Sequence, residues 1–216
     1  MNDPRKALRF IAAASLVALA ASRPAAAQGF AADLHAGYFG MAASESAKAV
    51  FGSTGGLTLG GGIRYGFGKH LFVEAGARVF SKDGERVFVA SAGGPVAHLG
   101  FPLKARLIPA YATIGYRFGR GKSVLVPYLG VGGGVTSYRE ESTVAGLALS
   151  ESQSKASGHA LVGLEYGRGH VRFAAEAIYT TVPNALGVGG VSKVYGEDNL
   201  GGFCAQGKLI FSRRTR

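Results

Sequence analysis

Most of the chain alternates apolar and polar side chains with a period of two residues. Residues 170–181 show this alternation, and the clearest run, at residues 71–79, places five apolar side chains on one face: Leu71, Val73, Ala75, Ala77 and Val79. Successive side chains of a β-strand point to opposite faces, so each run predicts a strand with one apolar stripe. The pattern predicts eight such strands, at residues 30–41, 56–67, 71–80, 103–118, 123–138, 159–167, 170–181 and 200–211.

The connections between these strands alternate in length. Three are tight and rich in glycine, at residues 68–70, 119–122 and 167–169. The other four are long, at residues 42–55, 81–102, 140–158 and 182–199. Tight turns join antiparallel neighbours, so the alternation predicts hairpins with all long loops at one end.

The composition of the apolar face separates a soluble barrel from a membrane barrel. Mid-strand apolar residues are small and aliphatic, whereas aromatic residues gather near the strand ends, which is typical of the aromatic belts of a membrane barrel. We expect Phe72 in the belt near the tight turns and Phe80 in the belt near the long loops. The main residues predicted for the belt near the tight turns are Tyr65, Phe67, Tyr116, Phe118, Tyr166, Phe173 and Phe211.

A sheet that crosses lipid must close on itself, because every backbone group needs a hydrogen-bond partner there. We therefore predict an all-β fold for residues 28–216: an eight-stranded antiparallel transmembrane β-barrel with short periplasmic turns and long extracellular loops. A soluble barrel in the periplasm is the competing fold.

Two strand endings, Tyr116-Arg117-Phe118 and Lys208-Leu209-Ile210-Phe211, and the stretch from Val126 to Gly134 are similar to sequences of one protein family. On these residues the chain resembles the small bacterial outer-membrane barrels of the OmpA, OmpX and OmpW kind, over residues 29–211. The resemblance implies an outer-membrane location, contact with lipid and lipopolysaccharide, and insertion by the barrel assembly machinery. The chain departs from the family pattern in one respect. Such proteins usually end on an aromatic residue, whereas here Phe211 is followed by residues 212–216.

The N-terminal segment has the three parts of a secretory signal. Basic residues precede an apolar run from Phe10 to Ala21, and Ala25-Ala26-Ala27 supplies small residues for cleavage before Gln28. The run is shorter than the roughly 20 residues that a membrane-spanning helix needs. We predict a signal peptide over residues 1–27. An amphipathic first helix is the alternative, but the alanine-rich run has no polar face.

The charge distribution changes the meaning of a basic composition. Lys and Arg number 24 against 13 Asp and Glu, a formal net charge of +11. A nucleic-acid-binding protein would gather this charge in one patch on a soluble face. Here it is sorted by end of the barrel, so we expect no nucleic-acid partner. We separately expect a monomer. The basic residues assigned to the tight turns and the tail are Lys69, Arg120, Lys122, Arg168, Arg213, Arg214 and Arg216.

Charged residues on the polar face of the strands would point into the barrel lumen. Eight strands leave an interior just wide enough for side chains, and charges buried there must be paired. We predict a salt-bridged plug, with the selectivity lining of a channel as the alternative. The predicted lumen charge network is Asp33, Arg64, Glu74, Arg78, Arg117, Glu165, Arg172, Glu176 and Lys208.

The fourth strand breaks the alternation of its charges. Lys104 and Arg106 have one parity, whereas Thr113 and Arg117 have the other, and Pro109 lies between them. Because proline cannot donate a ladder hydrogen bond, we predict a bulge or register change at residues 107–109.

No motif predicts a catalytic, cofactor-binding or metal site. His35 and His159 have lumen-facing parity, and His159 near Ser157 is the one arrangement that could suggest a lipid-modifying enzyme. Cys204 is predicted to face the lumen as a small residue. We expect a non-enzymatic protein that stabilises the envelope or makes surface contacts through its extracellular loops. The alternatives are a narrow porin-like channel for small solutes and a lipid-modifying enzyme.

Overall fold

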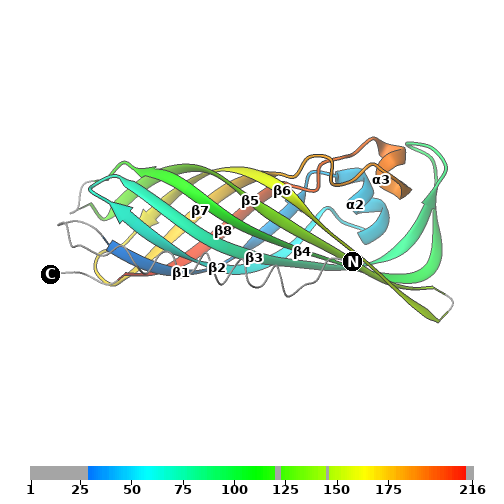
Figure 1. Ribbon diagram of the computed structural model, residues 1–216, viewed down its shortest axis with the longest axis horizontal. Coiled ribbons are helices and arrows are strands. Elements are labelled where there is room, and N and C mark those ends of the chain that lie inside the picture. Colours follow the sequence, from blue (N-terminus) through cyan, green and yellow to red (C-terminus); the bar gives the residue numbers. More distant parts are fainter. Residues whose placement is uncertain (1–28, 120–122, 145, 213–216) are drawn as a thin grey trace.

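The chain forms a closed barrel of eight antiparallel strands in the computed structural model, which describes residues 29–119, 123–144 and 146–212. Each strand pairs with the next along the chain, and the last pairs with the first (Figure 1). This confirms the predicted fold. The predicted signal peptide, residues 1–27, lies outside the described residues. The strands are β1 (Gly29–Met41), β2 (Gly55–Phe67), β3 (Leu71–Val89), β4 (Val96–Arg117), β5 (Leu125–Val144), β6 (Leu147–Tyr166), β7 (Val171–Thr181) and β8 (Gly202–Ser212).

The outer wall of the barrel is apolar, as the alternation predicts. Leu59, Ile114 and Val162 are 65%, 57% and 60% exposed. Such a surface is unfavourable in water, and it matches the apolar band that a membrane barrel presents to lipid. The stripe of residues 71–79 and the odd-numbered residues of β7 both lie on this wall.

Two of the predicted long loops are wrong, because strands occupy most of them. The pairing of β3 with β4 continues to Val89 and Val96, and that of β5 with β6 continues to Val144 and Leu147. These hairpins extend the wall beyond the barrel at the end opposite the tight turns, here called the outer end (Figure 1). The alternation fades there because both faces meet polar surroundings, so the sequence loses its apolar stripe while backbone pairing persists.

The bulge predicted near Pro109 is also wrong. Pairing of β4 with β5 keeps one register from Leu103 to Arg117, with Pro109 opposite Thr136. Lys104 and Arg106 point outward on the extended part of the wall, so their parity needs no register change. The register shift of β3 against β4 falls instead between Glu85 and Val87.

Two short helices cover the outer end, where the sequence predicted irregular loops. They are α2 (Ser44–Phe51) and α3 (Gly190–Tyr195) (Figure 1). Ala43, at the N-cap of α2, makes no side-chain cap. Glu197 fills this role, because its carboxylate accepts hydrogen bonds from the backbone N–H groups of Glu45 (3.0 Å) and Ser46 (2.9 Å). Neither helix, nor any other in the described ranges, is long and apolar enough to cross a membrane.

The aromatic residues divide between the wall and the interior. Tyr116 and Phe118 lie on the outer wall near the tight turns, with ring centroids 5.0 Å apart. Five other predicted belt residues face outward at the same end: Tyr65, Phe67, Tyr166, Phe173 and Phe211. Phe72 and Phe80, which were expected in the belts, are instead buried inside. Each is an even-numbered residue of β3, on the face opposite the apolar stripe.

Glycines make room for the large interior side chains, and this generates a testable prediction. A methyl group on Gly163 would overlap the ring of Tyr128, whereas one on Gly207 would meet open space on the outer wall. We expect Gly163→Ala to destabilise the barrel by about 1–3 kcal/mol through overpacking. The matched control, Gly207→Ala, should unfold at the wild-type urea concentration. Urea unfolding followed by tyrosine fluorescence measures both, and equal midpoints for the two variants would contradict the packing argument.

Candidate functional site

The lumen holds the candidate site, because all nine charged residues predicted for it point inward. Arg117 and Arg172, near the tight turns, are partly exposed. The other seven are at most 6% exposed: Asp33, Arg64, Glu74, Arg78, Glu165, Glu176 and Lys208. Most ion pairs of this network join residues that are far apart in sequence, so barrel closure brings the network together.

Glu165 is the centre of the layer nearest the tight turns. Its Oε1 accepts from Arg117 Nη2 (2.7 Å) and from Arg172, and its Oε2 accepts from Arg64 Nη1 (3.2 Å). Three guanidinium groups therefore share one buried carboxylate. Charge-assisted bonds of this kind are among the strongest in proteins, and here they tie β2, β4 and β7 to β6.

Lys208 and Glu74 connect this layer to the middle of the lumen. Glu74 accepts from Arg64 Nε (2.8 Å) and from Lys208 Nζ (2.6 Å). Lys208 Nζ also lies 3.4 Å from Glu176 and 3.8 Å from Asp33. The Lys208 side chain is fully buried, so its charge depends on these three carboxylates in place of water.

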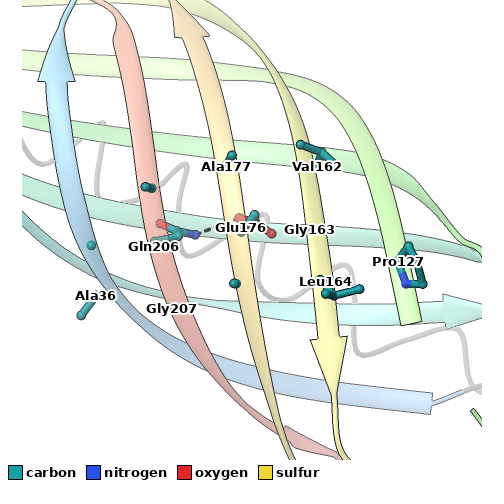
Figure 2. Close-up of a pocket in the computed structure, with 12 residues that line it drawn as sticks. Ala36, Pro127, Val162, Gly163, Leu164, Glu176, Ala177, Gln206 and Gly207 are labelled. Atoms are coloured by element: carbon teal, nitrogen blue, oxygen red, sulfur yellow. Dashed lines mark hydrogen bonds between the residues drawn. The ribbon is translucent and has the colours of Figure 1, made fainter. Parts of the chain in front are cut away.

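Several uncharged residues complete the network, although none of them was predicted to belong to it. Tyr128 donates to Glu176 (2.8 Å), and Gln206 Nε2 donates to the other oxygen of the same carboxylate (2.8 Å), the bond dashed in Figure 2. The guanidinium of Arg64 lies over the rings of Phe72 (4.4 Å) and Tyr128. The sequence signal for these residues was their position in the alternation, which places each of them on the lumen-facing side of its strand.

Arg78 occupies a separate layer towards the outer end. It donates to Thr180 (3.4 Å) and lies 5.3 Å from the ring centre of Tyr111. No carboxylate of the described residues comes within ion-pair distance of it. Glu74, a near neighbour on β3, forms ion pairs with Arg64 and Lys208 instead. Arg78 and Glu74 therefore do not pair.

An apolar layer closes the lumen above Arg78. Phe39 and Phe80 pack edge to face, with ring centroids 5.1 Å apart, and Leu107, Val182 and Leu200 join them. The cavity between this layer and Arg78 has a volume of about 20 Å³. That is room for roughly one water molecule. Little free space for a hydrated solute is therefore left between the layer and Arg78.

The histidines make structural contacts. His35 donates to Asp33 (2.9 Å), and the Nε2 atom of His159 lies 2.7 Å from the hydroxyl oxygen of Thr113, with no bond to Ser157. His70 and His170 each donate to a backbone carbonyl beside a tight turn. Cys204 is buried in the lumen. Within the described ranges, no three His, Cys, Asp or Glu side chains gather in a way that could hold a metal ion.

A shallow groove of about 730 Å³ lies on the outer wall, and its lining does not suggest a reaction or a specific ligand. It crosses β1 and β5–β8, and its surface is made by small and aliphatic residues such as Ala36, Ala177 and Leu164 (Figure 2). Glu176 and Gln206 border it but bond to one another and to lumen residues. The groove is part of the lipid-facing surface.

Removing one carboxylate should show how far the barrel depends on the network. Glu74→Gln leaves the buried charge of Lys208 and Arg64 under-compensated, so we expect a loss of about 3–5 kcal/mol in stability. Glu151→Gln, on the exposed part of β6, is the matched control and should leave stability unchanged. Urea unfolding measures both variants. Wild-type stability of Glu74→Gln would show that the ion pairs do not hold the barrel together.

Comparison with solved structures agrees with the architecture. A major outer membrane protein from Thermus thermophilus superposes with a TM-score of 0.58 at 12% sequence identity, covering 87% of this chain and all of that one. Neisserial surface protein A gives a TM-score of 0.49 at 17% identity, with 85% and 94% covered. The N-terminal barrel domain of Pseudomonas aeruginosa OprF gives 0.47 at 14% identity, with 86% and 99% covered. At such identities, the Thermus protein shows the fold alone.

Sequence comparison supplies the family. No curated protein is detectably similar in sequence to this chain. Residues 11–184, however, match the outer membrane protein β-barrel domain. This match covers most of the chain and agrees with the closed eight-stranded barrel and its apolar wall. The protein therefore belongs to the outer membrane protein β-barrel domain family and resides in the bacterial outer membrane.

Proposed function

We propose that the protein is a non-enzymatic barrel that stabilises the envelope or makes surface contacts through its outer end. The observation that carries this proposal is the contrast between the two parts of the molecule. The middle of the lumen is occupied by ion pairs and by the apolar layer around Phe39 and Phe80, whereas two hairpins extend the outer end beyond the barrel. A barrel with an occupied lumen serves to anchor the protein in the membrane. We therefore assign the activity to the hairpins and helices at its outer end.

The outer end has enough structure to make a specific contact. The β3–β4 and β5–β6 hairpins project from it, and α2 and α3 pack against one another and against β3 (Figure 1). A cavity of about 230 Å³ lies among these elements, lined by apolar residues such as Phe51, Leu103 and Tyr138. Arg86 and Glu140, 3.7 Å apart, add an ion pair at its edge. We assign this end to the cell exterior and the tight turns to the periplasm.

The partners follow from this placement. Membrane lipid and lipopolysaccharide would cover the apolar wall, and the barrel assembly machinery would insert the chain. The end of β8 offers that machinery an aromatic residue, Phe211, although the chain continues beyond it. All strand edges are paired within one chain, which favours a monomer.

Shortening one hairpin tests the proposed role of the outer end. Arg139 pairs with Ser152, so replacing residues 140–151 by Asn-Gly keeps the register and removes the projecting part of β5–β6. We expect this variant to reach the outer membrane at the wild-type level but to fail in complementing cells that lack the protein. The readouts are attachment to surfaces and resistance to detergent with EDTA.

A smaller replacement provides the control for this experiment. Thr143 pairs with Ala148, so replacing residues 144–147 by Asn-Gly removes only the tip. This control should complement more fully than the shortened hairpin. Full complementation by both variants would show that the β5–β6 hairpin is dispensable and would contradict the proposed role.

A narrow channel is the second candidate, favoured by the charged lumen and by Arg78, which has no carboxylate partner in the described residues. The apolar layer argues against it, and we expect the purified protein to give no conductance steps in planar lipid bilayers. The protein should be reconstituted at a density verified by gel electrophoresis. Reproducible steps that change with Glu74→Gln would establish the channel in place of a closed plug.

A further inference from the structure

The tight-turn end of the lumen contains a cationic cavity that the plug does not explain. Its volume is about 100 Å³, and Arg64, Lys69, Arg117 and Arg172 line it together with Phe72 and the end of β8. This is roughly the volume of three water molecules, and it is comparable to a small oxyanion. The cavity lies on the periplasmic side if the outer end faces outward.

Charge is unbalanced around this cavity. Glu165 is the carboxylate that contacts Arg64, Arg117 and Arg172 together. Glu74 compensates part of Arg64, but it is also the close partner of Lys208. Lys69 adds a further positive charge at the rim, and no ion pair within the described ranges involves it. Positive charge therefore exceeds negative charge at this end.

Hydrogen bonding is incomplete at the same place. The Nε atoms of Arg117 and Arg172 are buried and donate to no group of the described residues. A buried donor without an acceptor costs free energy, so the ion pairs of the lumen leave these two arginines incompletely bonded. Glu165 does not supply the acceptor, because it bonds these two arginines through their Nη atoms.

The geometry points to a binding site for a phosphate group between Arg117, Arg172 and Lys69. A tetrahedral oxyanion carries the negative charge that the cavity lacks and several acceptor oxygens for the guanidinium donors. Free phosphate and the headgroup of an anionic phospholipid share this chemistry. The site is independent of the proposed surface role, because it lies at the opposite end of the barrel.

Calorimetric titration of the folded barrel with sodium phosphate tests the site. The full barrel is refolded in octyl glucoside, which contains no phosphate, and titrated at constant ionic strength. We expect saturable binding at one site. Arg172→Gln and Arg117→Gln should each weaken it about tenfold or more, the factor that corresponds to one lost charge-assisted hydrogen bond. Either substitution leaves Glu165 with two arginines, so each variant still tests the proposal if the other fails to fold.

Arg168→Gln is the matched control, because it removes one positive charge from an exposed tight turn at the same end. It should change the affinity less than about twofold, as expected for a screened surface charge. Absence of saturable phosphate binding by the wild-type barrel would overturn the proposal. An equal loss in Arg168→Gln and Arg172→Gln would also overturn it, because general surface charge would then account for the binding.

Competition with dihexanoyl phosphatidylglycerol distinguishes the two sources of the phosphate group. Displacement of phosphate at lower concentrations of this lipid, lost in Arg172→Gln, supports a phospholipid headgroup as the ligand. Binding of phosphate that the lipid does not displace supports a free anion. Both results support the oxyanion site, and binding of neither ligand overturns it.

Discussion

Closure of the sheet between β1 and β8 is the constraint on which the rest of this structure depends. In lipid, an open strand edge would leave backbone groups without partners, so the wall has to be continuous. With eight strands, a continuous wall encloses a space only as wide as a few side chains. Polar residues placed inside lose water, and the carboxylates of Glu74, Glu165 and Glu176 compensate the enclosed cations. The ion-pair network of the lumen thus follows from the number of strands.

The same constraint explains which parts of the fold could be predicted from the sequence. Where lipid meets one face of a strand and the packed lumen meets the other, alternation is strict, and β1, β2, β7 and β8 were placed within a few residues. Beyond the membrane band the two faces have similar surroundings. The outer halves of β3–β6 therefore lack the pattern, and the sequence predicted loops. The helices α2 and α3 are too short for a periodic signal.

The lumen network, too, could be predicted from the sequence only in part. Parity along each strand was enough to predict which charges point inward. The tight turn at residues 68–70 also fixes the register of its hairpin, so that Arg64 lies opposite Glu74. The contact of Lys208 with Glu74, 134 residues apart, depends on the stagger of the strands around the whole barrel, which no local pattern contains. The position of Tyr128 against Gly163 depends on a long hairpin whose register the sequence left open.

The cap that Glu197 provides for α2 has a consequence for the order in which the molecule is completed. The helix belongs to the first connection of the chain, but the carboxylate that caps it belongs to Glu197, in the connection that leads into the last strand. The cap forms only when the connection into β8 lies beside the first connection, as it does in the closed barrel. The outer end therefore acquires its final shape only in a fully closed barrel, and a binder specific for that shape would distinguish finished molecules from those still being inserted.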